Sequence, residues 1–264
     1  MNKTGEEPIL SLPERHNRIL ALLQQFGSIS VAQLAERFKV SEVTIRKDLS
    51  YLEQQKKLYR THGSAILISP YISDRHVNEK EKRNVAEKRA IGAFAASLIA
   101  QDDSIIIASG TTVTFLAREI NPAGHLTAIT ASVPVTQILS QCPDVDVIQL
   151  GGITRSSSVS VVGPFAEQML RSFNCSKLFI GVDGSDTEFG LTTTNMLEAS
   201  LNGAMIDAAQ KVIVLADSSK FGRRGFSKIC DLESVDRIIT DSGVQSVYLD
   251  RLRERGIEVT VVDV

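Results

Sequence analysis

Residues 41–49 read SEVTIRKDL and combine a helix-capping serine with two cations and a regular apolar spacing. Ile45, Leu49 and Leu52 recur at intervals of three and four residues, so they share one face of a helix that begins after Ser41. The residues turned outward are then Val43, Thr44, Arg46, Lys47 and Ser50. The stretch therefore predicts a helix that packs on a core through one side and presents cations and hydroxyls on the other.

Two further helices are expected before this one. After Pro13, which suits the first turn of a helix, apolar residues follow at helical spacing up to Gly27. Ser30 suits the cap of a second helix that ends near Phe38, and a three-residue turn separates this helix from the next. Three short helices with a tight turn between the last two predict a helix-turn-helix, whose final helix enters the major groove of DNA.

Four of the outward residues have specific expected contacts with DNA. Arg46 can form two hydrogen bonds to guanine or clamp a phosphate, and Lys47 supplies a point charge. Thr44 can bond a base or the backbone, and Val43 can touch a thymine methyl group. Asp48 lies at the edge of the buried face, where we expect it to pair with a neighbouring arginine rather than touch DNA, because an anion aimed at phosphate would repel it.

A β-hairpin is expected directly after the helix-turn-helix. The segment KKLYRTHGSAILI at residues 56–68 takes on strand character around Gly63, as the wing of a winged helix would. Arg60 and His62 at its tip are candidates to follow the DNA backbone or a minor groove. For His62, an exposed loop histidine without a function is an equally good interpretation.

The distribution of charge supports a polyanionic partner for the N-terminal part. The net charge is −2, but residues 1–65 hold 10 Lys and Arg against 7 Asp and Glu, so the cations are concentrated there. A small basic module on an acidic body is the pattern expected when one end of a protein meets nucleic acid. Taken alone, such a cluster is more often only a solvated face.

Composition limits the class of protein. A chain of 264 residues with 43% hydrophobic residues can form a small domain joined to a larger one. No signal sequence or membrane-spanning run is evident, so we expect a cytoplasmic protein without a membrane partner. The three cysteines are far apart and odd in number, which argues against a disulfide framework and a Cys-x-x-Cys metal site. We expect no metal and no cofactor.

The C-terminal part has the pattern of an α/β domain. Short segments that are apolar nearly throughout alternate with helical stretches, which predicts a mainly parallel sheet covered on both faces. These segments begin near residues 104, 126, 145, 177, 211, 237 and 257. The expected organisation is a winged helix-turn-helix over residues 1–68, a charged linker over 69–89 and the α/β domain over 90–264.

One loop of this domain is a candidate phosphate site. Residues Ser109, Gly110, Thr111 and Thr112 follow the first strand and begin a helix, where a glycine lets the backbone approach a ligand and a helix N-terminus favours negative charge. Hydroxyls and amides of the two threonines can bond phosphate oxygens. The alternative, held equally open, is an ordinary strand-to-helix turn with capping threonines.

Other loops after strands are candidates for the same site, since ligands of such sheets bind beyond the carboxyl ends of the strands. They contribute Thr130, Ser132, Gly151, Gly152, Asp183 and Lys220. Lys220 follows a strand end closely and can neutralise a ligand phosphate, although a surface lysine in a turn is as good an interpretation. Glycine pairs such as Gly151 and Gly152 are often only turns.

These motifs together resemble the DeoR family of bacterial transcriptional regulators. The resemblance runs from about residue 15 to residue 264 and rests on S-x-x-T-I-R-K-D-L, L-x-R-x-H-G-S-A, GTT, LGG, VGP, GLTT and DSSKF in the family's order. It implies a C-terminal domain similar to ribose-phosphate isomerases and glucosamine-phosphate deaminases that senses phosphorylated sugars. Ala108 departs from the family's aspartate before the Gly-Thr-Thr loop, which puts one sugar-hydroxyl contact in doubt.

The resulting hypothesis is a transcriptional repressor of a carbohydrate operon that binds double-stranded operator DNA and a phosphorylated sugar effector. A dimer or tetramer is expected, because one recognition helix reads too few bases to find a genomic site. The alternatives are an activator and a sugar-phosphate isomerase or deaminase with an accessory nucleic-acid-binding module. Asp183, Glu198, Asp217 and Lys220 are possible catalytic pieces, but Glu198 lies in a helical stretch, so we expect no catalytic residues.

Overall fold

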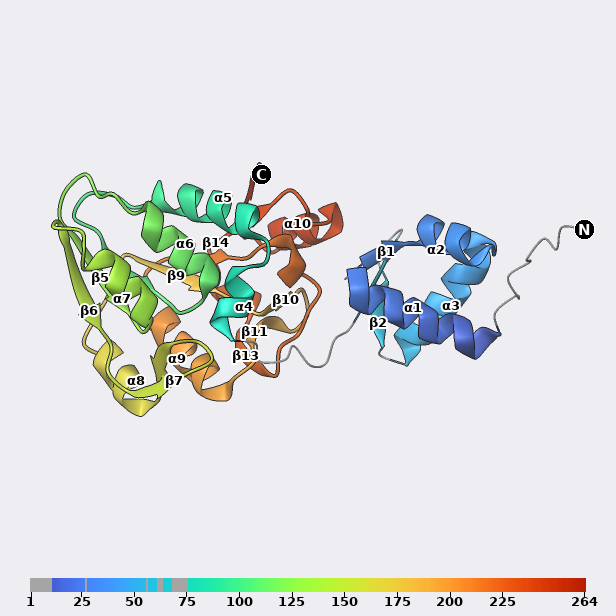
Figure 1. Ribbon diagram of the computed structural model, residues 1–264, viewed down its shortest axis with the longest axis horizontal. Helices are drawn as coiled ribbons and strands as arrows, with labels where there is room; N and C mark the ends of the chain where they lie inside the picture. Colours follow the sequence, from blue (N-terminus) through green and yellow to red (C-terminus); the bar gives the residue numbers. More distant parts are fainter. Residues whose placement is uncertain (1–10, 27, 56, 61–63, 68–75) are drawn as a thin grey trace, which may run out of the picture. The chain divides into compact units, whose positions relative to one another are not determined.

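A computed structural model describes residues 11–26, 28–55, 57–60, 64–67 and 76–264 of the chain. The chain divides into two compact units, with the boundary between Ser69 and Pro70. Figure 1 labels the elements of both units, which are described separately.

Three helices build the first unit: α1 (Leu12–Phe26), α2 (Val31–Phe38) and α3 (Glu42–Gln54). Ser30 caps α2 in a capping box with Gln33, and Ser41 caps α3 by accepting a hydrogen bond from the amide of Thr44 at 3.2 Å. Lys39 adopts a left-handed conformation between the two helices. The predicted helix-turn-helix is thereby confirmed, and its core includes the expected Ile45, Leu49 and Leu52.

A small antiparallel sheet completes this unit, in the order β1-β3-β2. Strands β2 (Leu58–Arg60) and β3 (Ser64–Leu67) pair in the register Leu58 with Leu67, which is the predicted wing hairpin. Strand β1 (Ser28–Ser30) pairs with β3 and was not expected, because its three residues Ser-Ile-Ser carry too little pattern to predict a strand. Residues 61–63, with His62, lie outside the described part of the chain.

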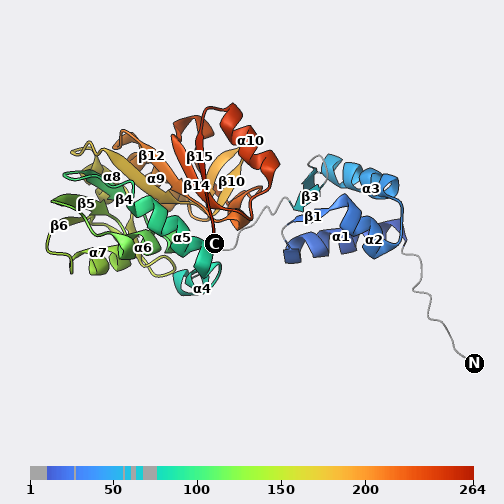
Figure 2. The ribbon, with the colours of Figure 1, turned by 90° about the horizontal axis from the view of Figure 1, so that it is seen from above.

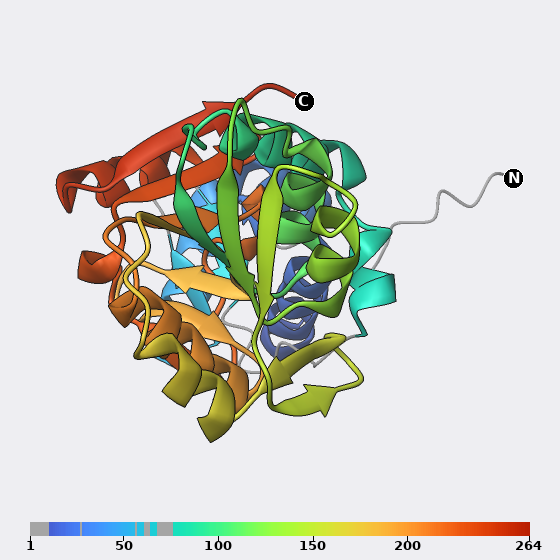
Figure 3. The same ribbon diagram turned by 90° about the vertical axis from the view of Figure 1, so that its left-hand side faces the viewer.

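The second unit is organised around a seven-stranded sheet in the order β15-β14-β12-β9-β4-β5-β6, with every neighbouring pair parallel. All seven predicted segments are strands, namely β4 (Ser104–Ile107), β5 (Leu126–Thr130), β6 (Val145–Gln149), β9 (Lys177–Gly181), β12 (Val212–Leu215), β14 (Arg237–Asp241) and β15 (Glu258–Val262). Figure 3 shows β4, β5 and β6 in green at one side of this sheet. The predicted α/β class is confirmed.

Helices cover both faces of the sheet. On one face α5 (Val85–Ala96), α6 (Thr111–Glu119) and α7 (Val133–Leu139) share a core with the strands, as Figure 2 shows. Strand residues such as Ile106 and Ile180 alternate to the other face. There α9 (Met196–Asp207) packs on β9, α8 (Pro164–Leu170) packs on α9, and α10 (Ser246–Glu254) packs on β15. Among the described helices, none is long and apolar enough to cross a bilayer.

Two small sheets extend beyond this frame and were not expected from the sequence. One is the hairpin of β7 (Ile153–Arg155) and β8 (Ser160–Val162). The other has the order β10-β11-β13 and is formed by residues Gly184–Asp186, Gly190–Thr193 and Ser227–Cys230. Their strands have three or four residues and are rich in Ser, Thr and Gly, which weakens any strand signal.

The segment expected as a linker over residues 69–89 contains structured elements of the second unit. Helix α4 (Val77–Glu81) and the first turn of α5 lie in it. The amide of Val77 donates a hydrogen bond to the carbonyl of Ser157 at 2.7 Å, and the side chain of Asn84 donates to Asp217 at 2.8 Å. The high charge of this stretch indicated a solvated connection, but several of its polar groups have partners in the second unit.

Candidate functional site

The exposed face of α3 has the chemistry predicted for a surface that reads a DNA groove. The side chains of Val43 and Lys47 are exposed, and Thr44 and Ser50 are partly exposed. Arg46 forms an ion pair with Glu42 at 2.5 Å, four residues earlier, with both side chains about half exposed. Such an exposed pair contributes little energy, so the guanidinium can exchange it for phosphate or guanine at small cost. The face meets the chemical requirement for a recognition helix.

The buried side of α3 is fixed by charge as well as by apolar packing. Asp48, almost fully buried, accepts hydrogen bonds from Arg15 of α1 at 2.5 and 3.0 Å and lies 3.2 Å from His16. The ring of His16 also stacks on Tyr51 of α3. This confirms that Asp48 pairs with an arginine, here one that is distant in sequence. The two helices are thereby held in a defined relative orientation.

The DNA contacts expected of the wing residues Arg60 and His62 stay predictions. Arg60 is the last residue of β2, and its backbone pairs with Ala65. His62 is not among the described residues.

In the second unit, the order of the strands reverses between β4 and β9, and parallel sheets bind ligands in a crevice at such a reversal. The region beyond the carboxyl ends of these two strands is called the crevice below. The chain proceeds from β4 outward to β5 and β6, and then returns to the opposite side of β4 with β9, from which β12, β14 and β15 follow outward. In parallel sheets the carboxyl ends of the two strands at such a reversal flank the usual ligand site. Ser109 follows β4 and Asp183 follows β9, so both predicted residues lie at this point.

The loop after β4 lies at the reversal of strand order and leads into α6. Gly110 has a φ of +129°, which favours glycine, and it caps α6. Thr111 and Thr112 are the first two residues of that helix, and their side chains are largely buried. The first amides of a helix have no carbonyl partners within it and carry partial positive charge. The loop therefore has the geometry of an anion-binding helix start.

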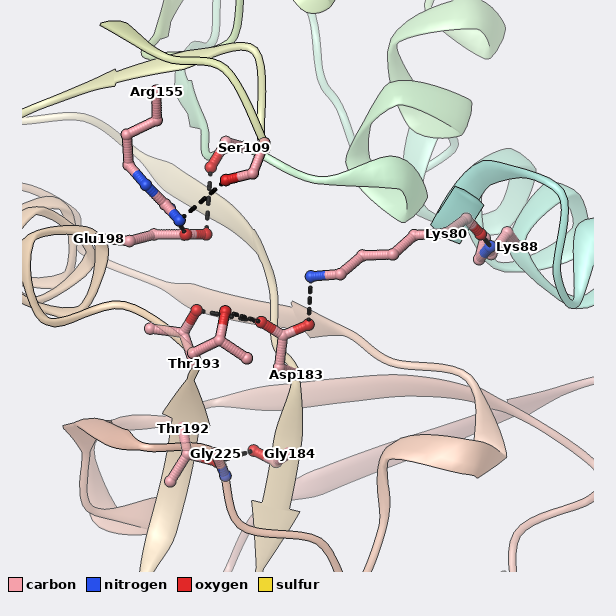
Figure 4. A network of polar contacts seen from close by, with 12 residues as sticks. Lys80, Lys88, Ser109, Arg155, Asp183, Gly184, Thr192, Thr193, Glu198 and Gly225 are labelled. Atoms are coloured by element: carbon pink, nitrogen blue, oxygen red, sulfur yellow. Dashed lines mark hydrogen bonds and ion pairs between the residues drawn. The ribbon is translucent and has the colours of Figure 1, made fainter. Parts of the chain in front are cut away.

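Asp183 is the centre of a polar cluster at the end of β9 (Figure 4). One carboxylate oxygen accepts a hydrogen bond from Lys80 at 2.8 Å, and the other accepts from the hydroxyls of Thr193 at 3.1 Å and Thr194 at 3.4 Å. Burial opposes ionisation of this carboxyl, but the charges of Lys80 and Lys220 outweigh it and lower the pKa of Asp183. Asp183 is therefore a buried carboxylate with two cations nearby, Lys80 and Lys220.

A second carboxyl group faces the same crevice from α9. Glu198 pairs with Arg155 of β7, and the hydroxyl of Ser109 donates a weak hydrogen bond to it at 3.4 Å. Burial, followed by the nearby charge of Asp183, raises the pKa of Glu198 despite its pairing with Arg155. The crevice thus contains two carboxyl groups of different proton affinity, each with its own cation.

A buried lysine supports the cluster from α5. Lys88 is almost fully buried, and its amine donates hydrogen bonds to the carbonyls of Lys80 and Arg83. Burial lowers the pKa of Lys88 to about 8, an effect that the charge of Asp217 opposes and that of Lys220 reinforces. Lys220 lies on the short 3-10 helix η1 (Ser218–Lys220). Its charge acts on both Lys88 and Asp183.

The structure brings together only some of the predicted effector residues. Six of them lie on the segments that follow β4, β9 and the neighbouring strand β12, namely Ser109, Gly110, Thr111, Thr112, Asp183 and Lys220. The hydroxyl of Thr130 instead donates a hydrogen bond to the carbonyl of Ile107 at 2.7 Å and accepts one from the amide of Ser132. Thr130 and Ser132 are both buried. Ser132 caps α7. These contacts favour structural roles for both residues.

Gly151 and Gly152 lie past the end of β6, the strand at the edge of the sheet and two strands from β4. A side chain at Gly152 would place its Cβ 2.6 Å from the carbonyl oxygen of Val162. The close approach of β8 therefore accounts for this glycine without a ligand.

Two residues of the cluster were not predicted from the sequence as site residues. Lys80 lies in the charged stretch expected as a linker, and Arg155 lies in an unpredicted hairpin. Glu198 was considered only as a possible catalytic piece in a helical stretch, whereas its side chain is only 15% exposed and pairs with Arg155. Nothing in the local pattern distinguishes these three from surface charges. Within the described residues, no group of three or more His, Cys, Asp or Glu is placed to hold a metal ion.

Comparison with known proteins identifies both units. Residues 15–71 match the family model described as a DeoR-like helix-turn-helix domain, and residues 83–242 match the one described as the DeoR C terminal sensor domain. The chain is 39% identical to the uncharacterized HTH-type transcriptional regulator YulB of Bacillus subtilis, over 94% of this chain and 96% of that protein. It is 37% identical to a putative aga operon transcriptional repressor of Escherichia coli O157:H7, over 98% and 97%.

A lactose phosphotransferase system repressor of Streptococcus mutans is also 37% identical, over 86% of this chain and 91% of that protein. Among solved structures, ribose 5-phosphate isomerase A of Methanocaldococcus jannaschii matches with 16% identity and a TM-score of 0.38, over 52% of this chain and 55% of that one.

Proposed function

Because the chain belongs to the DeoR family of transcriptional regulators, we propose that it represses a carbohydrate operon and that a phosphorylated sugar controls its binding to operator DNA. The observation that carries the proposal is the combination, in one chain, of an exposed cationic face on α3 with a helix start and two lysines, Lys80 and Lys220, near Asp183 in a second unit. Relatives named as repressors of an aga operon and of a lactose phosphotransferase system support the sugar-operon assignment.

Helix α3 would read the major groove through Arg46, Lys47, Thr44 and Val43. The buried pair of Asp48 with Arg15 would fix the angle at which this helix leaves the rest of the unit. Ser50, Arg60 and His62 remain proposed DNA contacts. Since one helix reads only a few base pairs, the operator should have two half-sites bound by a dimer or tetramer.

The effector would bind in the crevice with its phosphate at the start of α6. The amides of Thr111 and Thr112 and the amine of Lys220 provide donors and positive charge for it. Asp183 and Glu198 lie across the crevice and can accept hydrogen bonds from sugar hydroxyls. Ala108 offers no polar group at the end of β4, so recognition of the sugar would depend on these two acids.

Sensing rather than catalysis is the role that we propose for this site. An aldose–ketose isomerase needs a carboxylate free to take a proton from the substrate. Here Asp183 and Glu198 are both engaged by cations, through Lys80 and Arg155.

The proposal is tested by a mobility-shift assay with the purified chain and the DNA upstream of its own gene and of neighbouring sugar-metabolism genes. We expect a salt-sensitive, sequence-specific complex whose affinity changes when one sugar phosphate from a hexose-phosphate panel is added. Specific DNA binding that no sugar phosphate alters would contradict the effector part of the proposal. Absence of any sequence-specific complex would contradict the repressor assignment itself.

A further inference from the structure

Two cations in the crevice come from peripheral elements rather than from the sheet. Lys80 extends from α4 to Asp183, and Arg155 extends from β7 to Glu198, as Figure 4 shows. Each cation forms an ion pair with a carboxyl group that could otherwise accept hydrogen bonds from a ligand in the crevice. Both carboxyl groups are therefore neutralised by side chains from outside the main sheet.

These two peripheral elements are connected to each other. The amide of Val77, the first residue of α4, donates to the carbonyl of Ser157 in the turn between β7 and β8 at 2.7 Å. The hydroxyl of Ser157 in turn accepts a hydrogen bond from Arg155 at 3.1 Å. A shift of either element would therefore pull on the other.

The position of α4 depends on these contacts. A five-residue helix has almost no stability of its own, so tertiary contacts must hold it. Three groups of α4 have such contacts: the amide of Val77, the amine of Lys80 and the carbonyl of Lys80. The carbonyl accepts a hydrogen bond from the buried amine of Lys88. Helix α4 is also the first described element of the second unit after the strands of the DNA-binding unit.

An anionic ligand would change the balance of charge at this point. A phosphate in the crevice is repelled by Asp183 and Glu198 and attracted by the amine and guanidinium that now neutralise them. If Lys80 and Arg155 turn to the phosphate, the two carboxyl groups become available to sugar hydroxyls. Both halves of the ligand then gain charge-assisted hydrogen bonds.

We propose that Lys80 and Arg155 are effector-binding residues that leave Asp183 and Glu198 to hold the effector's phosphate, and that this exchange of partners moves α4 together with the β7–β8 hairpin. The inference rests on the proposed function, since it requires an anionic effector in the crevice. It adds a physical route by which effector binding in the crevice alters α4, the first described element after the DNA-binding unit. An effector can shift operator affinity only through such a difference between two states.

The test compares Lys80→Met with Lys82→Met, which removes the same charge from an exposed neighbour just after α4. Operator affinity is measured with and without the best-binding member of a panel of glucose, galactose, glucosamine and fructose phosphates, and binding of that probe is measured by calorimetry. Lys80→Met should bind the probe at least about tenfold more weakly, because it lacks one charge-assisted hydrogen bond. Its operator affinity without probe should shift toward that of the probe-saturated parent, because the Lys80–Asp183 pair no longer holds α4.

Lys80→Arg keeps the charge and should restore most of the response, which a merely structural role for the lysine would not predict. Hydrogen exchange of the parent should show faster exchange in α4 and in the β7–β8 turn when the probe is bound. The inference is overturned if Lys80→Met keeps the parent's fold-change in operator affinity, or if the probe binds the parent and leaves exchange in α4 unchanged. Failure of every panel member to bind the parent is a different result, because it rejects the proposed effector class and this inference with it.

Discussion

Asp48 of α3 and Arg15 of α1 form a buried, two-point ion pair with bonds of 2.5 and 3.0 Å. The pair links residues 33 positions apart and sits beneath the surface proposed to touch DNA. Removing the carboxylate would leave the guanidinium buried without its partner, which is far costlier than losing a surface pair.

We therefore expect Asp48→Ala to destabilise the DNA-binding unit by about 3 kcal/mol. The free energy of unfolding, measured by denaturant titration, checks this value. Glu42→Gln is the control on the same helix, because it breaks an exposed pair and should cost no more than about 1 kcal/mol. Equal effects of the two substitutions would show that the Asp48 pair is not buried as described.

Arg46→Ala should weaken operator binding by about 1–3 kcal/mol without changing the unfolding transition, because its side chain is exposed and its only described partner is Glu42. Lys47→Ala should weaken binding to all sequences alike and reduce the slope of affinity against salt by about one ion. Arg18→Ala, on an exposed position of α1, serves as the charge control. Unaltered operator affinity in Arg46→Ala would mean that α3 is not the reading helix.

Lys220→Ala should keep operator binding and lose effector binding by about tenfold or more, because it removes a cation from the carboxyl end of β12. Lys211→Ala removes the same charge from an exposed position at the opposite end of that strand. Calorimetry with the sugar-phosphate panel distinguishes the two. Equal affinity of both variants would place the phosphate elsewhere.

The buried amine of Lys88 makes the stability of the sensor unit depend on pH. Its pKa is about 8 in the folded protein and about 10.5 in the unfolded chain, so between these values the unfolded chain binds more protons. Below pH 8 both states are charged and the full burial penalty applies. As pH rises from about 8 to about 10.5, stability should therefore increase relative to Lys88→Met, by at most roughly 1.4 kcal/mol per pH unit. A flat difference between parent and variant across this range would contradict the lowered pKa.

The purified protein should not interconvert ribose 5-phosphate and its ketose, nor release ammonia from glucosamine 6-phosphate. In the proposed complex the carboxyl groups of Asp183 and Glu198 accept hydrogen bonds from sugar hydroxyls, so we expect neither to take a proton from a substrate carbon, and Ala108 offers no further base at the end of β4. A coupled assay over hours at high protein concentration provides the measurement. Turnover that disappears in Glu198→Gln would favour the isomerase or deaminase alternative.

The sequence was sufficient to predict elements whose residues repeat regularly. The spacing of Ile45, Leu49 and Leu52 predicted α3, and seven apolar runs predicted the seven strands of the parallel sheet. It also predicted that Asp48 pairs with an arginine, although not that this would be Arg15.

Contacts between short polar elements could not be predicted in the same way. Lys80, Arg155 and Glu198 have the local surroundings of solvated charges, and only the tertiary fold brings them to one crevice. Conversely, Thr130, Ser132 and Gly152 follow strands as ligand residues do, but hydrogen bonding and close packing of the backbone explain them. The position after a strand predicts proximity to the site better than it predicts contact with a ligand.

The ion pair between Lys80 and Asp183 also determines where the sensor can be cut from the rest of the chain. A fragment that starts at residue 90, the boundary expected from the sequence, lacks Lys80, Asn84 and Lys88. Asp183 would then be buried without the amine of Lys80, and Asp217 would lose the hydrogen bond from the side-chain amide of Asn84. Ligand affinities measured on such a fragment would describe a differently charged crevice, so an isolated sensor should begin no later than His76.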